Sequence, residues 1–171
     1  MRNKFLFMIG RKLMSLGKLK IYIIDDQETY FSKNILEIVK KAGFSSIERY
    51  YIVNKELLEK LLSDPPDIII LDIKGITEKD VAKNGFGIAK VMFEKTNSYV
   101  VVTSAHKFYL HETHKQYDYV IQERLLTAVD LIDELTNIVE NYLKYKINFY
   151  KKITFRIGFK IVKKALMSST D

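Results

Sequence analysis

The sequence predicts an α/β protein built on a doubly wound, five-stranded parallel sheet. Short runs rich in isoleucine and valine recur along the chain, and stretches with apolar residues at helical spacing separate them. Runs that are apolar throughout are typical of strands buried on both faces, as in parallel sheets covered by helices. With 171 residues, 47% of them hydrophobic, the chain suits one domain with a substantial core and short extensions.

The first half of the chain contains two strand–helix pairs. Residues 21–24 are apolar and end abruptly at two aspartates, which indicates a buried strand opening into a loop. Apolar residues at helical spacing over residues 28–41, followed by Gly43, indicate the first helix. The cycle repeats with a strand over residues 47–53 and a helix over residues 55–62, before Asp-Pro-Pro breaks the pattern.

The second half completes the alternation. Residues 68–71 are the third strand, residues 86–93 a helix, residues 99–103 the fourth strand, and residues 119–121 a short fifth strand. A long helix then follows, with apolar residues at Leu125, Val129, Ile132, Leu135, Ile138, Val139 and Tyr142. Because crossovers between parallel strands are right-handed, we expect the helices to cover both faces of the sheet.

The charge divides the chain into three parts. Residues 1–20 carry six basic residues and no acid, and residues 144–171 carry eight basic residues and one acid. The net charge of the whole chain is +7, so the middle must be acidic. We expect a basic amphipathic N-terminal extension over residues 1–18, the folded domain over residues 19–143, and a basic, apolar C-terminal extension over residues 144–171.

The basic ends allow three interpretations. They can pack on the acidic domain or a second subunit, dock on an anionic membrane or a partner, or bind nucleic acid. We favour packing and do not expect nucleic acid, because the ends are too short for a recognised DNA-binding domain. Residues 153–161 fit both a strand and a helix, and their periodicity does not decide between them.

Several classes of protein are disfavoured. The chain has no cysteine, so neither disulfides nor thiolate metal sites are expected. The apolar run after Arg2 and Lys4 is too short for a signal peptide, and no stretch approaches the roughly 20 apolar residues of a spanning helix. We expect a cytoplasmic protein, with peripheral membrane attachment left open by the basic ends.

Acidic residues follow two of the predicted strands. Asp25 and Asp26 come directly after the first strand, and Asp72 follows the third. Carboxyl ends of parallel strands form the edge at which such sheets bind ligands, so three carboxylates would meet there. Their repulsion favours a divalent cation, and carboxylate oxygens suit Mg2+. Any one of these aspartates alone would more often be a turn former or helix cap.

Four segments carry a family resemblance. They are Ile-Tyr-Ile-Ile-Asp25-Asp26, Asp-Ile-Ile-Ile-Leu-Asp72, Asn84-Gly85-Phe86-Gly87 and Val-Val-Val-Thr-Ser104-Ala105-His106. In this order and spacing they resemble the signatures of bacterial response-regulator receiver domains, over about two-thirds of the chain. The resemblance implies the flavodoxin-like, CheY-like receiver fold, with strand order 2-1-3-4-5.

The resemblance also implies roles for individual residues. Asp72 would be the phosphoacceptor, and Asp25, Asp26, Asp72 and the backbone carbonyl of Lys74 would hold Mg2+. Ser104 is similar in position to the hydroxyl that contacts the phosphoryl group, with Thr103 as the neighbouring alternative. Tyr119 resembles the switch aromatic that moves with this hydroxyl, although an ordinary strand-edge tyrosine explains it equally well.

The chain departs from the family at the end of the fifth strand. The family has a Lys-Pro pair there, whereas Gln122 and Glu123 follow residues 119–121 in this chain. Gln122 can donate a hydrogen bond to a phosphoryl group but supplies no positive charge. Arg124 lies two residues beyond Gln122 on the same strand face and is a candidate substitute.

Two further segments are unusual. The loop after Asp72 lacks the usual proline and is roughly five residues longer than typical, so it could cover the acidic pocket. The histidines at positions 106, 111 and 114 lie close in sequence, but they lack a fixed ligand spacing and an acid partner, so we expect solvent-facing side chains rather than a Zn2+ site.

These observations leave three functional hypotheses. The first is a single-domain receiver-like signalling protein that accepts a phosphoryl group on Asp72, from a histidine kinase or another phosphodonor protein, and modulates an unidentified output partner. The second is a pseudo-receiver that is not phosphorylated and acts through its basic ends. A Mg2+-dependent phosphohydrolase or nuclease ranks last, because no general base is identifiable. We expect no enzyme beyond self-phosphotransfer and autodephosphorylation, and a homodimer stays open.

Overall fold

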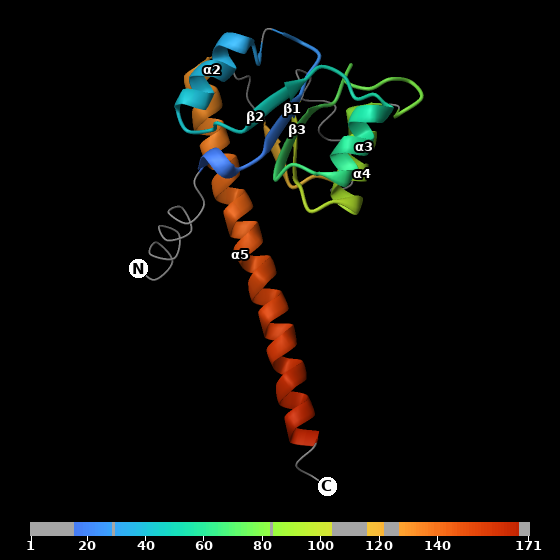
Figure 1. Ribbon diagram of the computed structural model, residues 1–171, viewed down its shortest axis with the longest axis vertical. Helices are drawn as coiled ribbons and strands as arrows, with labels where there is room; N and C mark the ends of the chain where they lie inside the picture. Colours follow the sequence, from blue (N-terminus) through green and yellow to red (C-terminus); the bar gives the residue numbers. More distant parts are fainter. Residues whose placement is uncertain (1–15, 29, 83, 104–115, 122–126, 168–171) are drawn as a thin grey trace. The chain divides into compact units, whose positions relative to one another are not determined.

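A parallel sheet forms the centre of the structure. The computed structural model describes residues 16–28, 30–82, 84–103, 116–121 and 127–167, with side chains described up to residue 148. Its five strands have the order β2-β1-β3-β4-β5 (Figure 1). They are β1 (Ile21–Ile24), β2 (Ile47–Tyr50), β3 (Ile68–Asp72), β4 (Tyr99–Thr103) and β5 (Tyr119–Ile121). The predicted fold class and strand order are confirmed.

The helices alternate with the strands. They are the short 3-10 helix η1 (Leu16–Lys18), α2 (Lys33–Lys41), α3 (Lys55–Ser63), α4 (Gly85–Lys95) and α5 (Ala128–Met167). Helix α2 begins later than the residue 28 predicted from its apolar pattern. Ser32 is its N-cap, and the Ser32 hydroxyl accepts a hydrogen bond from the Ile35 N–H at 3.4 Å. The residues before Ser32 are therefore left as a loop after β1.

Strand β2 is shorter than predicted. It ends at Tyr50 rather than Val53, because its pairing with β1 ends at the Ile24–Tyr50 pair. Beyond that point β1 turns into its loop and offers β2 no further partner. Val53 instead forms an isolated parallel bridge with Thr77, in the loop between β3 and α4.

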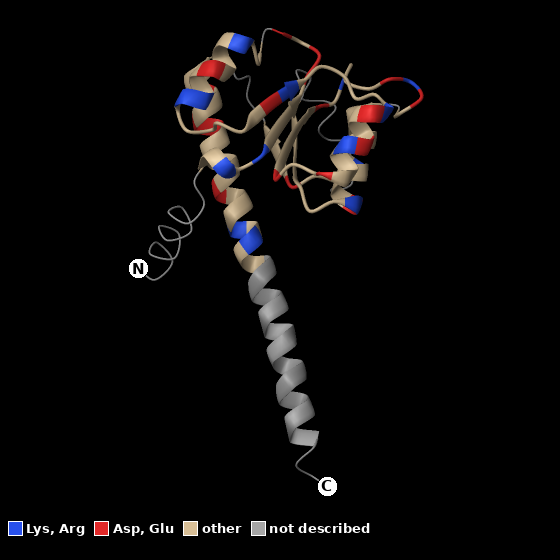
Figure 2. Ribbon diagram, in the orientation of Figure 1, with Lys and Arg blue, Asp and Glu red and all other residues tan. Residues whose placement is uncertain are grey.

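The core lies on both faces of the sheet. All residues of β1 and β3 are buried, as expected for strands covered by helices on both sides. One face packs against α3 and α4, which lie together on one side of the sheet in Figure 1. In the same view α2 lies on the opposite side. Acidic and basic residues interleave along the exposed surfaces of α2 and α3 (Figure 2).

The C-terminal part of the chain is helical. Helix α5 has 40 residues and continues through Met167, so the helical interpretation of residues 153–161 is confirmed. By internal contacts the chain divides into two compact units, Met1–Leu135 and Thr136–Asp171, with the boundary inside α5. Among the helices of the described residues, none is both long and apolar enough to cross a membrane. Of the predicted N-terminal extension over residues 1–18, residues 1–15 lie outside the described part of the chain, and Leu16–Lys18 form η1.

Candidate functional site

Three aspartates meet at the carboxyl edge of the sheet. Strands β1 and β3 are neighbours, with Ile24 paired to Leu71, so the residues that follow them lie side by side. One carboxylate oxygen from each of Asp25, Asp26 and Asp72 lies within 4.8 Å of the others. Asp25 and Asp72 are buried, whereas Asp26 is exposed. The structure thus brings together the three acids that the sequence singled out.

Backbone N–H groups hold Asp72 in place. It is the last residue of β3 and is only 7% exposed. Its Oδ1 accepts a hydrogen bond from the Ile73 N–H at 2.6 Å and a longer one from the Lys74 N–H at 3.5 Å. The loop that follows β3 therefore fixes the orientation of the Asp72 carboxylate.

The carboxyl group of Asp25 has a raised pKa. Its pKa is raised to about 6, chiefly because burial removes water from the charged carboxylate, with repulsion from Asp72 and Asp26 adding to the effect. A 2.7 Å hydrogen bond from the Gln27 N–H to Asp25 Oδ1 and the positive charge of Arg49 both lower the pKa and only partly compensate. Ionisation of Asp25 is therefore costly without a bound cation.

The donor set fits a hard divalent cation. Three carboxylates supply oxygen ligands, and Mg2+ binds through few protein oxygens plus water. Repulsion among these acids would be relieved by a positive ion between them. Asp25, Asp26 and Asp72 would hold the ion. Lys74 lies in the loop directly beyond Asp72, and its carbonyl as a further ligand stays a prediction.

Some of the other predicted site residues lie within the described part of the chain, and others do not. Thr103 ends β4 and pairs with Asp72 across the sheet, so it lies next to the acid cluster. Ser104, Gln122 and Arg124 lie outside the described residues, as do all three histidines, and their predicted roles stay predictions. Tyr119 begins β5 and is half-buried; burial, together with the carboxylate of Glu134, raises the pKa of its hydroxyl.

Arg49 supports the site and was missed in the sequence. Its guanidinium donates hydrogen bonds to the carbonyl oxygens of Phe31 at 2.8 Å and Asp25 at 3.1 Å. It also stacks on the Tyr51 ring, 4.4 Å from the ring centroid. These contacts tie both ends of the loop after β1 to β2, and this loop carries Asp26. An arginine on a predicted strand is a visible signal, but its partners are far away in sequence.

Two glycines make close approaches to the acids. A Cβ on Gly85 would lie 2.1 Å from the Asp72 carbonyl oxygen, so no other residue fits there without movement. A Cβ on Gly75 would lie against the Asp26 carboxylate. Glycine as the first residue of α4 is a poor helix former, and this gives a sequence signal for Gly85. The sequence pattern indicates Gly85 only as part of the Asn84–Gly87 motif and predicts no role for Gly75.

Comparison with known proteins identifies the fold. No protein-family model matches the sequence, and no curated protein is similar to it at a significant level. Among solved structures, the response regulator domain of Thermotoga maritima CheB is 16% identical, with a TM-score of 0.52 over 74% of this chain and 96% of that one. The N-terminal domain of a response regulator/sensory box/GGDEF three-domain protein from Carboxydothermus hydrogenoformans is 23% identical, with a TM-score of 0.51 over 75% and 98%.

A third structure agrees with these two. A two-component transcriptional regulator AraC from Clostridium phytofermentans is 18% identical, with a TM-score of 0.51 over 77% of this chain and 99% of that one. The chain therefore has the CheY-like receiver fold, as the resemblance in its sequence implied. At these identities the likeness extends to the fold, and function has to be argued from the site.

Proposed function

We propose that this protein is a response-regulator-like signalling module in which Asp72 accepts a phosphoryl group at a Mg2+ site. The observation that carries the proposal is the cluster of Asp25, Asp26 and Asp72, with carboxylate oxygens within 4.8 Å of one another. The receiver fold places this cluster at the edge of the sheet where such folds bind ligands. The fold likeness to signalling domains rather than to classical enzymes agrees with a regulatory role.

The chemistry is a single phosphoryl transfer. An Asp72 carboxylate oxygen attacks phosphorus, a P–O bond forms, and the bond from phosphorus to the donor nitrogen or oxygen breaks with its electron pair leaving on the donor. The product is an acyl phosphate on Asp72. When bound, Mg2+ neutralises charge on the phosphoryl oxygens. Asp25 and Asp26 would hold the cation, and the Ile73 and Lys74 N–H groups orient the Asp72 carboxylate.

Phosphorylation is tested with acetyl phosphate. The wild type, incubated with Mg2+ and acetyl phosphate, should gain the mass of one phosphoryl group in intact mass spectrometry, and hydroxylamine should remove it. Asp72→Asn should gain nothing, whereas Asp133→Asn, which changes an exposed acid on α5, should behave as wild type. No added mass in the wild type, or equal addition in Asp72→Asn, would overturn the proposal.

A second candidate function rests on α5. This helix has 40 residues, Ala128–Met167, and residues 144–171 carry eight basic residues against one acid. With Gln122 in place of a lysine, a pseudo-receiver that docks on an anionic membrane through this helix is the alternative. It requires no phosphoryl group on Asp72.

Vesicle co-sedimentation tests the alternative. The full chain should co-sediment with phosphatidylserine-containing vesicles but not with purely phosphatidylcholine vesicles, and salt should weaken the association. Replacing Lys151, Lys152, Lys163 and Lys164 by glutamine changes charge with little effect on helix propensity and should abolish it. Equal sedimentation of this variant and the wild type would exclude docking through these lysines. Asp72→Asn should leave it unchanged.

A further inference from the structure

The loop between β3 and α4 is attached to Val53, which lies between β2 and α3. We call residues 73–82 the strap. The Val53 N–H donates a 2.6 Å hydrogen bond to the Ile76 carbonyl, and the Glu78 N–H donates a 3.3 Å bond to the Val53 carbonyl. These bonds flank the parallel bridge between Val53 and Thr77. The side chains of Val53 and Ile76 are fully buried, so the strap is docked by its backbone and by apolar packing.

The strap is also closed internally. The Thr77 hydroxyl donates a 3.0 Å hydrogen bond to the Ala82 carbonyl, and the Val81 and Ala82 N–H groups donate to the Glu78 carbonyl at 3.1 and 3.3 Å. An exposed ion pair of 2.9 Å joins Lys55 at the start of α3 to Asp80. A long loop with this many internal bonds has a defined conformation, which a merely connecting segment does not need.

The strap contacts Asp72 through the Ile73 and Lys74 N–H groups and lies against Asp26 at Gly75. Gly75 has a φ of 76°, a left-handed conformation that other residues rarely adopt. A Cβ there would lie 2.0 Å from Asp26 Oδ2 and 2.6 Å from Asp26 Cγ, so the glycine backbone packs directly on the carboxylate. Within the described part of the chain no hydrogen bond holds the Asp26 carboxylate. Contact with Gly75 is therefore what limits the position of the exposed member of the cluster.

We propose that the strap is a positioning element of the cation site: docked at Val53, it places Gly75 against Asp26 and holds that carboxylate beside Asp25 and Asp72. Gly75 is a positioning residue, because it acts through Asp26. This inference rests on the cation site of the proposed function. It assigns a purpose to the extra length of the loop, since a shorter connection from Asp72 to α4 could not reach Val53 as well.

The test measures Mg2+ affinity directly. Isothermal titration calorimetry at low temperature compares the wild type with Gly75→Ala, whose added Cβ would push Asp26 away. We expect Gly75→Ala to bind Mg2+ about 10- to 100-fold more weakly, the range typical of losing a residue that orients a metal ligand. Gly43→Ala is the matched control. Gly43 also has a positive φ, 115°, but a Cβ there would meet no atom closer than 4.0 Å, and we expect wild-type affinity.

A second variant loosens the strap without touching Asp26. Thr77→Val keeps the side-chain shape and removes the bond to the Ala82 carbonyl. We expect Mg2+ affinity to fall about fivefold, the equivalent of one ordinary hydrogen bond. If Gly75→Ala does not fold, the Mg2+ affinity of Thr77→Val tests the positioning role. Weaker binding in either variant, with the control at wild-type affinity, supports a positioning role.

A metal-free measurement tests the contact itself. In urea unfolding without divalent cations, Gly75→Ala should be less stable than Gly43→Ala, and the extra loss should disappear when Asp26→Ala is added, because the clashing carboxylate is then gone. Two results separate the hypotheses. A wild type that binds no Mg2+ overturns the proposed cation site and this inference together. Folded variants that bind Mg2+ as tightly as a binding-competent wild type overturn only the positioning role.

Discussion

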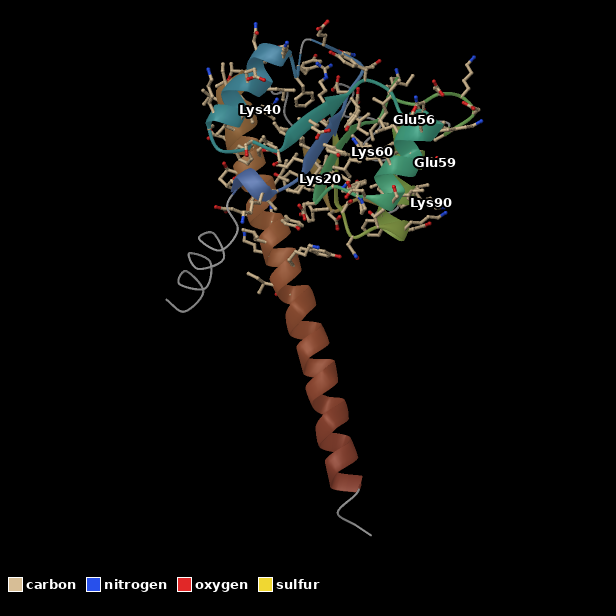
Figure 3. The ribbon with its side chains drawn as sticks, viewed as in Figure 1. Lys20, Lys40, Glu56, Glu59, Lys60 and Lys90 are labelled. Atoms are coloured by element: carbon tan, nitrogen blue, oxygen red, sulfur yellow. The ribbon has the colours of Figure 1, made fainter. Side chains whose placement is uncertain are left out.

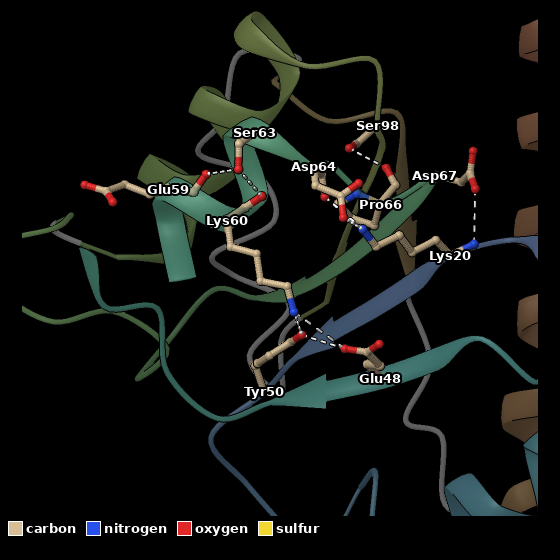
Figure 4. A network of polar contacts seen from close by, with 10 residues as sticks. All are labelled: Lys20, Glu48, Tyr50, Glu59, Lys60, Ser63, Asp64, Pro66, Asp67 and Ser98. Atoms are coloured by element: carbon tan, nitrogen blue, oxygen red, sulfur yellow. Dashed lines mark hydrogen bonds and ion pairs between the residues drawn. The ribbon is translucent and has the colours of Figure 1, made fainter. Parts of the chain in front are cut away.

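Charged side chains are paired with opposite charges at the amino edge of the sheet, whereas like charges cluster at the carboxyl edge. At the amino edge, the Lys20 N–H donates to Asp67 Oδ2 at 3.1 Å, and the Lys20 ammonium donates to the carbonyl and carboxylate of Asp64 (Figure 4). At the carboxyl edge, Asp25, Asp26 and Asp72 face one another, and their repulsion contributes to the raised pKa of Asp25. The amino edge is arranged for stability, and the carboxyl edge has the repulsion that a cation would relieve.

Aromatic rings and a second lysine form a further network between α3 and the strands β1 and β2. The ammonium groups of Lys20 and Lys60 lie 5.1 and 5.3 Å from the centroid of the Tyr22 ring. Figure 3 labels both lysines, Lys20 just before β1 and Lys60 on α3. The Lys60 ammonium donates a 2.8 Å hydrogen bond to the Tyr50 hydroxyl, which in turn donates a 2.6 Å bond to Glu48 (Figure 4). Each cation there has both an acceptor and an aromatic face. This network gives α3 a polar attachment to β1 and β2.

The largest expected effect is on the carboxyl edge. Asp25→Asn should raise the metal-free unfolding free energy at pH 7.5 by up to about 3 kcal/mol, the equivalent of the shift in pKa to about 6. Because the folded pKa is raised, the wild type loses stability as pH rises from about 4 to 6. The advantage of Asp25→Asn should therefore vanish below pH 4. Urea unfolding of the wild type and Asp25→Asn, from below pH 4 to pH 7.5, measures the difference in stability. The control Asp133→Asn should show no such pH dependence.

Cation binding should offset the stability that is lost when Asp25 ionises. Mg2+ at about 100 times its Kd should stabilise the wild type by about 2.7 kcal/mol, since a ligand that binds only the folded state stabilises it by RT ln(1 + L/Kd), where L is the free ligand concentration. The pH dependence between 4 and 7 should flatten at the same time, because ionised Asp25 then has a cation beside it. Thermal unfolding with and without Mg2+ measures both effects. Equal stabilisation of Asp72→Asn would show that the ion binds elsewhere.

Removing a buried hydrogen bond at the amino edge should cost less. The Ser98 hydroxyl is buried and donates a 2.6 Å bond to the Pro66 carbonyl. Ser98→Ala should lower the unfolding free energy by about 1 to 2 kcal/mol, because the carbonyl loses its donor away from water. Ser63→Ala is the matched control, since Ser63 is exposed and bonds the Glu59 carbonyl of its own helix. Mg2+ affinity should not change in either variant.

The smallest effect is expected for an exposed ion pair. Asp64 is 75% exposed and pairs with Lys20. Asp64→Asn should lower the unfolding free energy by less than about 1 kcal/mol, and the loss should shrink in high salt. Urea unfolding at low and high ionic strength measures this. A loss as large as that of Ser98→Ala would contradict the view that the amino edge depends on buried bonds rather than on surface charge.

Local patterns were sufficient for most of the fold and for the acid cluster. A strand buried on both faces must be apolar throughout, so residues 21–24 and 68–71 were recognisable without any partner. The acids directly after these strands then had to meet, because parallel strands end at the same edge. The predicted start of α2 was wrong, because the apolar spacing of the helix continues into the loop before the Ser32 N-cap. The predicted end of β2 was wrong, because the strand ends where its pairing with β1 ends, and the sequence of β2 does not show that point.

The sequence by itself therefore determined the parallel sheet, its alternation with helices and the three acids at its carboxyl edge, since each depends on neighbours in the chain. Only the tertiary structure decided that Arg49 holds the loop after β1, that the strap docks on Val53, and that Gly75 packs on Asp26. These contacts join segments far apart in sequence, and their energies depend on distances that no periodicity encodes. Composition alone could not reveal them.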